Sequence, residues 1–282
     1  MKISVVILSY NQDKYISDTI DSVLTQKFDG ELEIIIGDDC SSDNTRCILR
    51  EYEKKFPNII KLIFNNSNLG VFKNFFCTVS HCSGDLICLC GGDDTWNENK
   101  LNTQLRYFSN NNVDVHHSRA FIVDKDGSRI GEGFSKKGKL IYNNYICASS
   151  ACFTKKFFSD YVRSVDPLSK NWKMEDYPMW LYAYLYYKIG YSETPLVNYR
   201  IISNSITHDS NIKKRIEFEE NVYEIRKYFF KNNSKILNKI KAIYLGNLAY
   251  LYKKNDDYVK YRECCLSQHS IKGVIKYCLS FL

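Results

Sequence analysis

The sequence predicts an α/β fold with a mainly parallel sheet and helices on both faces, followed by a C-terminal helical appendage. Apolar runs of five or six residues alternate with amphipathic segments of helical spacing through the first two thirds of the chain. From about Ile212 the pattern becomes purely helical. The chain has 282 residues, of which 44% are hydrophobic and 25% charged, enough for one large domain and an appendage.

Each predicted strand is a short apolar run bounded by turn residues, and each predicted helix carries apolar residues three and four positions apart. The predicted strands are Ile3–Leu8, Leu32–Ile36, Ile59–Phe64, Asp85–Cys90, Val113–His117, Ala120–Asp124 and Thr194–Ile202. The predicted helices are Tyr15–Gln26, a segment between Asn44 and Pro57, Val71–Ser80, Asn99–Phe108 and Glu175–Tyr187. Residues 127–150 are rich in Gly and Lys, which predicts a mobile loop.

The eleven cysteines are predicted to be reduced core residues of a cytosolic protein, because their number is odd. Several lie within apolar runs: Cys77, Cys88, Cys90 and Cys278. Met1-Lys2 leads directly into Ile3–Leu8, an apolar run too short for a signal peptide. No apolar stretch reaches the roughly 18 residues that span a bilayer.

The net charge of +7 is concentrated at the C-terminal end. Residues 211–282 hold 15 basic and 7 acidic residues, whereas residues 1–210 hold 24 and 25. A basic segment of this kind favours an anionic surface. Two interpretations are open. Either these helices pack on the rest of the chain and leave their lysines in water, or Ile271–Leu282 lies in a lipid headgroup layer.

Two pairs of adjacent carboxylates follow predicted strands at the edge where open α/β sheets bind ligands. Asp93-Asp94, after Gly91-Gly92, is either a site for a hard cation or an N-cap pair for the next helix. Asp38-Asp39 is either a helix cap or an acceptor for the imide N–H of uracil, with Tyr10 as a stacking partner. Neither G-x-G-x-x-G nor G-x-x-x-x-G-K-[ST] occurs, which weakens a dehydrogenase or P-loop interpretation.

Several spaced motifs resemble those of family 2 glycosyltransferases with the GT-A fold, of the bacterial surface-polysaccharide type. The matching motifs are Ile3–Asn11, Tyr15-Ile16, Asp21–Gln26, Glu33–Thr45, Asn68–Phe75, Gly84–Trp96, Lys100-Leu101 with Gln104, Glu175–Leu181 and Tyr199-Arg200. They cover roughly residues 1–207 in the family's order, and they are specific for the family but not for the sugar.

The resemblance implies a GT-A catalytic domain over residues 1–210 and a basic helical region over 211–282. The nucleotide-sugar part would be about 1–97 and the acceptor part about 98–210.

The resemblance assigns donor-nucleotide roles to residues after the first two strands. It implies that Tyr10 and Asp39 bind the base, with Ser9 and Asn11 nearby. For Lys73, on the first turn of a predicted helix, contact with the diphosphate and a solvated surface position are both open.

The same resemblance assigns the metal and the chemistry. Asp94 would bind Mg²⁺ or Mn²⁺ at the donor diphosphate, Asp93 would contact the donor, and Asp176 would be the catalytic base of an inverting enzyme. Two positions depart from the family pattern. Gly91 stands where many relatives carry an acid, and whether Asp93 takes over that contact is open; Ile202 stands where relatives often have His.

Five further residues have weaker, acceptor-side or supporting assignments. Trp96 either stacks on a sugar or packs under its loop, and Trp180 either walls the acceptor pocket or anchors its helix. Glu175 and Arg200 belong to the later signatures. His208 is either a phosphate or metal contact or an exposed loop residue.

Together the motifs predict an inverting, hexosyltransferase-type, metal-dependent glycosyltransferase that uses Mn²⁺ or Mg²⁺. It would move a sugar from a nucleoside-diphosphate sugar, a UDP-sugar, to a saccharide acceptor on a lipid diphosphate, in O-antigen or capsule synthesis. Its expected place is the cytoplasm, with peripheral contact at the inner face of the cytoplasmic membrane and no nucleic-acid partner. Two alternatives are a sugar-nucleotide nucleotidyltransferase, which releases diphosphate, and a non-catalytic subunit that binds nucleotide sugars.

Overall fold

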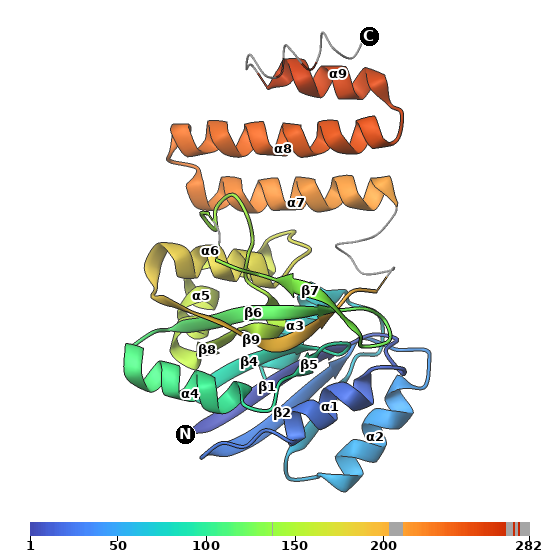
Figure 1. Ribbon diagram of the computed structural model, residues 1–282, viewed down its shortest axis with the longest axis vertical. Helices are drawn as coiled ribbons and strands as arrows, with labels where there is room; N and C mark the ends of the chain where they lie inside the picture. Colours follow the sequence, from blue (N-terminus) through green and yellow to red (C-terminus); the bar gives the residue numbers. More distant parts are fainter. Residues whose placement is uncertain (137, 203–210, 269–272, 274–275, 277–282) are drawn as a thin grey trace. The chain divides into compact units, whose positions relative to one another are not determined.

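The computed structural model describes residues 1–136, 138–202, 211–268, 273 and 276. The chain divides into two compact units, Met1–Ile201 and Ile202–Leu282. The first unit holds a nine-stranded sheet with its helices, and the second is helical (Figure 1). The predicted α/β class and the helical C-terminal region are both confirmed.

Four parallel strands form the first half of the sheet, in the order β3-β2-β1-β4. They are β1 (Lys2–Ser9), β2 (Glu31–Asp38), β3 (Ile60–Phe64) and β4 (Leu86–Gly91). The helices that connect them are α1 (Ile16–Leu24), α2 (Thr45–Lys55) and α3 (Val71–Val79). Each lies within a few residues of its predicted bounds, because these segments have the clearest apolar periodicity in the chain.

The second half of the sheet is mixed, continuing from β4 in the order β8-β6-β9-β5, with β7 paired to β6. Its strands are β5 (Thr95–Trp96), β6 (Val115–Val123), β7 (Arg129–Gly133), β8 (Cys152–Thr154) and β9 (Ile189–Arg200). The accompanying helices are α4 (Lys100–Asn111), α5 (Lys155–Val165), α6 (Asp176–Tyr186) and the short turns η1 (Ala148–Ser150) and η2 (Pro167–Ser169). Only β6 and β9 run parallel here; β5, β7 and β8 pair antiparallel with their neighbours.

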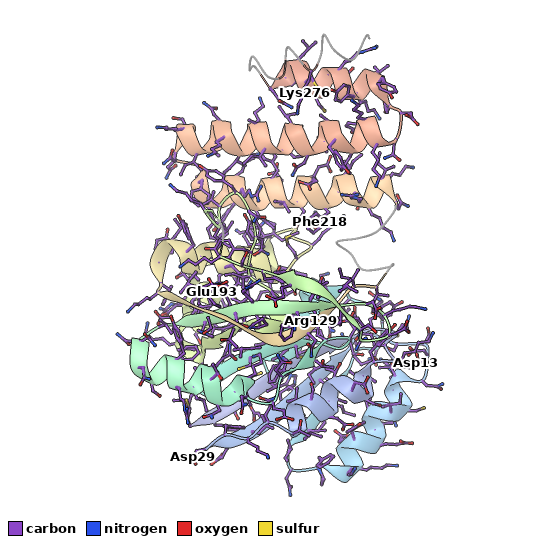
Figure 2. The ribbon with its side chains drawn as sticks, viewed as in Figure 1. Asp13, Asp29, Arg129, Glu193, Phe218 and Lys276 are labelled. Atoms are coloured by element: carbon purple, nitrogen blue, oxygen red, sulfur yellow. The ribbon has the colours of Figure 1, made fainter. Side chains whose placement is uncertain are left out.

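Two sequence predictions are wrong in this half. The two strands expected at 113–117 and 120–124 are one strand, β6, because its polar residues 116–118 are buried between paired neighbours. The loop expected at 127–150 begins with β7 and ends with η1. β7 is solvent-exposed and has few apolar residues, so pairing with β6 rather than hydrophobicity makes it a strand. Its Arg129, labelled in Figure 2, lies 3.4 Å from the ring centroid of Phe121.

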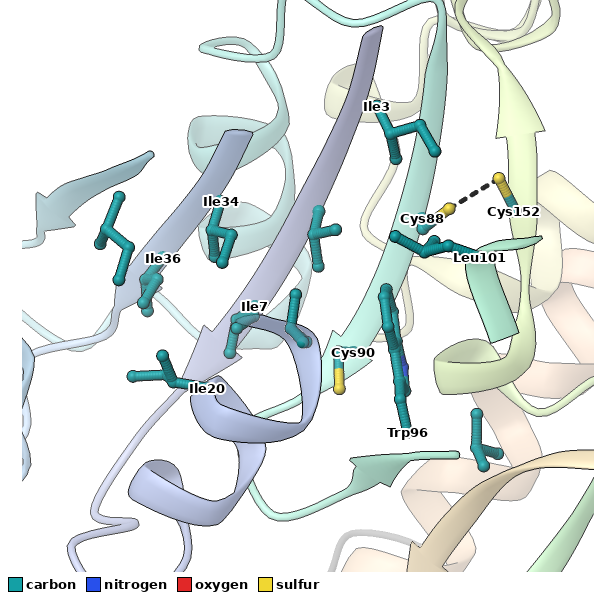
Figure 3. Packing of buried hydrophobic residues seen from close by; sticks show 14 of the residues in the cluster. Ile3, Ile7, Ile20, Ile34, Ile36, Cys88, Cys90, Trp96, Leu101 and Cys152 are labelled. Carbon is teal, nitrogen blue, oxygen red and sulfur yellow. Dashed lines mark hydrogen bonds between the residues drawn. The ribbon is translucent and has the colours of Figure 1, made fainter. Parts of the chain in front are cut away.

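The main core lies on one face of the sheet, where alternate residues of neighbouring strands meet α1, α2 and α4. Ile3 and Ile7 of β1 lie beside Ile34 and Ile36 of β2, and Ile20 of α1 covers them (Figure 3). Each buried side chain of this size contributes roughly 1.5–3 kcal/mol.

The opposite face carries α3, which packs closely against β2 at Gly37. A Cβ at Gly37 would lie 1.8 Å from Thr78 Oγ1, so only glycine fits at this position. Asn74 Nδ2 donates to the Gly37 carbonyl oxygen at 3.0 Å, which fastens the start of α3 to the end of β2.

The cysteines of the described residues are free thiols. Cys88 and Cys90 share the main core, as their alternate positions in a strand predict. Cys88 of β4 faces Cys152 of β8 across the antiparallel pair, with 2.7 Å between the sulfur atoms (Figure 3).

The second unit consists of α7 (Ile212–Phe230), α8 (Ser234–Lys254) and α9 (Tyr258–Ser267). An Asn or Asp side chain caps the N-terminus of each helix, as turn chemistry predicts. Tyr223 and Tyr244 stack between α7 and α8, with ring centroids 4.4 Å apart. Within the described ranges no helix is both long and apolar enough to cross a membrane. The proposed interfacial segment Ile271–Leu282 lies almost wholly outside these ranges.

Candidate active site

The turns after β1, β2 and β4 lie side by side at one edge of the sheet. In the parallel register Ser9 stands opposite Asp38, and Leu8 stands opposite Gly91. The Gly92 amide donates to the Leu8 carbonyl oxygen at 2.9 Å, which joins the end of β4 to that of β1. This edge, at the carboxyl ends of parallel strands, is where the sequence places its donor-binding residues.

The turn after β1 presents an aromatic ring and an unsatisfied hydroxyl. Asn11 has a left-handed backbone, with φ of 53°, and its side-chain oxygen accepts a 2.8 Å bond from the Ser42 amide. Its own amide donates to Ser41 Oγ at 2.9 Å. Tyr10 is 49% exposed, whereas Ser9 Oγ is buried and has no partner among the described residues. Asn11 therefore holds the turn, and the exposed ring of Tyr10 is accessible to a ligand.

Asp39 is buried and fixed by three donors. Its Oδ1 accepts from the Leu69 amide at 2.8 Å and from Asn65 Nδ2 at 2.9 Å, and its Oδ2 accepts from the Gly70 amide at 2.8 Å. One lone pair of Oδ2 is left for a further donor such as a base N–H. Lys73 lies one turn into α3 and is exposed.

Its neighbour Asp38 is a structural carboxylate. Asp38 is fully buried and accepts from Arg46 Nε, from the Ser41 amide at 3.1 Å and from Ser41 Oγ. Arg46 also donates to the Asn65 carbonyl oxygen at 2.5 Å. Neither aspartate caps α2, whose N-cap residue is Asn44. Asp38 instead fastens the loop, and Asp39 keeps a lone pair for a further donor.

The Gly91–Asp94 turn is held from three sides. Asp94 Oδ1 accepts from the Arg200 amide at 2.8 Å, and Oδ2 accepts from Ser149 Oγ. Thr19 of α1 donates to the carbonyl oxygens of Gly92 at 3.0 Å and Asp94 at 2.8 Å. Strand β9, helix α1 and turn η1 therefore all fix the conformation of this turn.

Burial disfavours the charged forms of Asp93 and Asp94, the two carboxylates of the turn. Desolvation raises the pKa of Asp94 to about 8, and the adjacent charge of Asp93 adds to this rise. Desolvation also raises the pKa of Asp93, and the Arg200 guanidinium opposes that effect. A divalent cation beside both carboxylates would favour their charged forms.

The oxygens of this turn fit a divalent cation shared with a ligand. A Cβ on Gly91 would lie 3.1 Å from both Asp93 Oδ1 and Asp94 Oδ2, and 3.5 Å from Ser149 Oγ, so three oxygens converge there. The described residues contain no group of three His, Cys, Asp or Glu side chains that would enclose a metal alone. Mg²⁺ in phosphate-binding sites commonly has one or two carboxylates, with phosphate and water oxygens as the other ligands.

Arg200 is committed to backbone contacts at this turn. Its Nε donates to the Asp93 carbonyl oxygen at 2.8 Å, and its Nη1 donates to those of Asp124 at 3.2 Å and Lys125 at 3.1 Å. The guanidinium also lies 4.7 Å from the centroid of the Tyr15 ring. These contacts give Arg200 a supporting position next to the carboxylates.

Trp96 packs beneath the turn. It is 4% exposed and belongs to the main core (Figure 3). Its Nε1 donates to the Ser149 carbonyl oxygen at 3.1 Å, and Lys100 Nζ lies 3.9 Å from its ring centroid. Burial favours packing over stacking on a sugar.

Asp176 begins α6 and is half-buried. Its Oδ1 accepts from the Tyr177 amide at 2.6 Å, and Asn144 Nδ2 lies 3.5 Å from its Oδ2. Desolvation raises the pKa of Asp176, and the bonds from the Tyr177 amide and Asn144 oppose this rise. Desolvation and the Asp176 charge together raise the pKa of Glu175 to about 8.

Two buried aromatic residues of α6, Trp180 and Tyr177, anchor the helix and the segment around Leu140. Trp180 is fully buried, and its ring meets that of Phe153 edge-on at 6.1 Å. Tyr177 donates its hydroxyl to the carbonyl oxygens of Leu140 at 3.0 Å and Ile141 at 3.1 Å. Trp180 therefore anchors α6, which is one of the two roles left open by the sequence.

Asp94 and Asp176, 82 positions apart in the sequence, act on the same buried thiol. Desolvation raises the pKa of Cys147 most, and the charges of Asp94 and Asp176 both raise it further. The side-chain partners of these two carboxylates also lie in one short segment, since Ser149 Oγ donates to Asp94 and Asn144 Nδ2 lies 3.5 Å from Asp176 Oδ2. His208 lies outside the described residues.

Sequence reasoning missed Thr19, Asn144 and Ser149. Ser149 and Ser150 are buried between Ala148 and Ala151, directly before β8. A run of small residues beside a strand indicates that another part of the chain packs closely against it. Here the run lies in a Gly- and Lys-rich segment, whose composition predicted a loop instead.

Comparisons with known proteins agree with these observations. The sequence profile of glycosyl transferase family 2 matches residues 4–160, more than half of the chain. The chain belongs to glycosyl transferase family 2. The predicted family is thus confirmed.

Relatives with described roles match about half of the chain. The UDP-Glc:alpha-D-GlcNAc-diphosphoundecaprenol beta-1,3-glucosyltransferase WfgD of Escherichia coli is 31% identical over 144 residues, 51% of this chain and 54% of WfgD. The putative teichuronic acid biosynthesis glycosyltransferase TuaG of Bacillus subtilis is 32% identical over 143 residues, 50% of this chain and 56% of TuaG. In three 35% identical mycobacterial proteins the match spans only 38% of their length.

Solved structures show the fold over nearly the whole chain. S. aureus TarS 1–349 in complex with UDP-GlcNAc superposes with a TM-score of 0.65 at 18% identity, over 94% of this chain and 80% of that one. The mannosyltransferase PcManGT of Pyrobaculum calidifontis, in complex with GDP-Man and Mn²⁺, superposes with a TM-score of 0.63 at 11% identity. The match covers 99% of this chain and 79% of that one. The GT-A-like fold of this glycosyltransferase-family chain is thereby confirmed.

Proposed function

We propose that the chain is an inverting, metal-dependent glycosyltransferase that moves a sugar from a UDP-sugar to a saccharide acceptor carried on a lipid diphosphate. We further propose that it serves the synthesis of a surface polysaccharide such as O-antigen or capsule. The observation that carries the proposal is that one short segment contacts both carboxylates: Ser149 Oγ donates to Asp94, and Asn144 Nδ2 lies 3.5 Å from Asp176 Oδ2.

Donor binding is assigned to the turns after β1, β2 and β4. The exposed Tyr10 ring stacks on the base, and Asp39 Oδ2 accepts the imide N–H of uracil. Ser9 Oγ, buried without a partner in the described part of the chain, is a donor or acceptor for the nucleoside. Asn11 shapes the turn, and Lys73, exposed on α3, reaches toward the diphosphate.

Asp94 and Asp93 would hold Mn²⁺ or Mg²⁺ against the donor diphosphate, since their oxygens converge beside Gly91. When bound, the cation would neutralise charge on the departing nucleoside diphosphate. The similar PcManGT structure is a complex with both GDP-Man and Mn²⁺, which supports this assignment.

The chemistry assigned to Asp176 is a single displacement. Asp176 takes the proton from the acceptor hydroxyl, whose oxygen bonds to the anomeric carbon as the bond from that carbon to the diphosphate oxygen breaks. The configuration at that carbon inverts because one attack occurs from the side opposite the leaving group. The raised pKa of Asp176 makes it a stronger base than an ordinary aspartate.

The proposed acceptor follows from the name of a relative, and the proposed location follows from the positive charge of the C-terminal helices. The name of WfgD describes an acceptor sugar on diphosphoundecaprenol. In this chain α8 contains no Asp or Glu, and its five lysines are all exposed: Lys235, Lys239, Lys241, Lys253 and Lys254. We propose that the basic C-terminal helices, through the exposed lysines of α8, contact the anionic inner face of the cytoplasmic membrane. Failure of the chain to co-sediment with anionic vesicles at low salt would refute this contact.

The function is tested by the group that leaves the donor. The purified chain is screened by thermal shift against nucleoside-diphosphate sugars with and without Mn²⁺, and the best donor is then incubated with a lipid-diphosphate saccharide. Release of UDP with transfer of the sugar supports the proposal. Release of diphosphate indicates a nucleotidyltransferase, and donor binding without any turnover indicates a binding subunit.

A further inference from the structure

Ser149 is a buried hydroxyl with two partners, and both belong to the Gly91–Asp94 turn. Its Oγ donates to Asp94 Oδ2 and accepts a 2.9 Å bond from the Gly91 amide. The side chain is 4% exposed. One hydroxyl thus links the last residue of β4 to a carboxylate three positions later.

The bond from Ser149 completes the restraint of the Asp94 carboxylate. Asp94 Oδ1 accepts from the Arg200 amide at 2.8 Å, so each oxygen has one donor. A carboxylate bound at both oxygens cannot rotate freely, yet each oxygen keeps a lone pair for another partner. Because the Arg200 donor is a backbone amide, Ser149 is the side chain on which this orientation depends.

Ser149 is in turn held from behind by side chains of the core. Trp96 Nε1 donates to the Ser149 carbonyl oxygen at 3.1 Å, and Gln104 Nε2 donates to that of Ser150 at 2.9 Å. The fully buried Lys100 donates to Gln104 Oε1 at 2.6 Å. Turn η1 is therefore fixed before any ligand arrives, as a support for ligand-binding groups requires.

We propose that Ser149 is a positioning residue that orients Asp94 for a divalent cation. The inference rests on the proposed function, because it takes Asp94 as the cation ligand. It also explains the use of glycine at position 91. A Cβ there would lie 3.1 Å from Asp94 Oδ2 and 3.5 Å from Ser149 Oγ, so a side chain would crowd the bond between them.

The test is the affinity for Mn²⁺, measured by the electron paramagnetic resonance signal of free Mn²⁺ with UDP present. Ser149→Ala removes the donor to Asp94, and partners of a metal-binding carboxylate typically change metal affinity by about 10- to 100-fold. We expect a Kd for Mn²⁺ at least about tenfold higher than in the parent chain.

Ser150→Ala is the matched control. Ser150 is also a buried hydroxyl of η1, but it donates to the carbonyl oxygens of Cys147 at 2.8 Å and Ser118 at 3.2 Å, not to Asp94. We expect both variants to lower the metal-free melting temperature, and only Ser149→Ala to weaken Mn²⁺ binding. Equal loss of Mn²⁺ affinity in both variants would reduce Ser149 to a structural role and overturn the proposal.

A second variant keeps the test decisive if Ser149→Ala does not fold. Trp96→Phe removes the donor to the Ser149 carbonyl oxygen and leaves the Asp94 contacts in place, so it should raise the Kd for Mn²⁺ by a smaller factor. Unchanged Mn²⁺ affinity in the folded variants overturns the role of Ser149 alone. A parent chain that binds no Mn²⁺ overturns the metal dependence of the proposed function, and the inference falls with it.

Discussion

Asp94 and Asp176 are both carboxylates of the candidate site, yet they are held in different ways. Asp94 is almost fully buried, accepts bonds at both oxygens, and lies in a turn fixed by Thr19, Ser149 and Arg200. Asp176 is half-buried, and the contact with Asn144 is 3.5 Å long. The proposed donor side thus lies at the ends of the parallel strands with support from η1 and β9, and the proposed acceptor side lies at the start of α6.

In the proposed function, the difference has a consequence for substrate binding. The proposed donor side is already hydrogen-bonded, so donor and cation would meet preformed contacts. Among the described residues Asp176 Oδ2 has one long contact, with Asn144, so the proposed base would be able to accept the proton of an incoming hydroxyl. Substitutions on the two sides should therefore affect different kinetic constants.

The largest expected effect comes from Asp176→Asn. Loss of the base should lower kcat for transfer by about 10²- to 10⁴-fold while the KM for the donor stays near that of the parent. Initial rates of UDP release with saturating acceptor measure this. Asp160→Asn is the control, because Asp160 lies on α5 in surface ion pairs with Lys156 and Arg163. Full activity of Asp176→Asn would exclude Asp176 as the base.

Substitutions on the proposed donor side are expected to lower both the stability of the protein and its affinity for the donor. Arg200→Ala removes the donors to three carbonyl oxygens and should reduce the free energy of unfolding by about 2–3 kcal/mol. The KM for the donor should rise as well, since the Asp93 carbonyl oxygen loses its partner. Urea unfolding and donor titration test both effects.

Arg200→Lys sharpens this prediction, because lysine keeps the charge but lacks the planar fork that reaches several acceptors at once. It should resemble Arg200→Ala in stability. Parent-like stability of Arg200→Lys would show that charge, rather than the geometry of the bonds, holds the turn.

The sequence predicts the positions of the carboxylates at the strand ends well. Asp39, Asp93 and Asp94 follow apolar runs, and parallel strands bring their ends to one edge, so local patterns place them together. The roles inside the pairs are not readable this way. Asp38 and Asp39 are neighbours with the same chemistry, and their contacts in the fold distinguish them: Ser41 and Arg46 donate to Asp38 and make it structural.

The segment that precedes β8, which contacts both Asp94 and Asp176, is harder to predict from sequence. Ser149 and Asn144 lie in a segment whose composition predicts a loop, and their contacts join residues 55 and 32 positions apart. Strand β8 has three residues, too few to show periodicity. The resemblance to the family supplied Asp176, but not the segment that lies beside it.

A smaller effect is expected from the pair at the start of α6. Asp176 must be charged to act as a base, and its raised pKa causes activity to fall as the pH drops through that pKa. The pKa of Glu175 is raised to about 8 in part by the Asp176 charge, so Glu175 is still neutral while Asp176 ionises. Glu175→Gln mimics that neutral form, so the acid limb of the pH profile of kcat should stay in place. A shift of the acid limb to lower pH would show that Glu175 is charged while Asp176 ionises.

The smallest effect is expected at Asn144, and its size measures how loosely Asp176 is held. A 3.5 Å contact is at the limit of hydrogen bonding, so Asn144→Ala should change kcat by about twofold or less. Tyr177→Phe is the comparison, because its hydroxyl donates to Leu140 and Ile141 at 3.0 and 3.1 Å and holds the segment that carries Asn144. Loss of such a bond, about 1 kcal/mol, should raise the KM for the acceptor roughly fivefold. If Asn144→Ala instead lowered kcat about a hundredfold, Asp176 would be as firmly positioned as Asp94, and the contrast between the two sides would not hold.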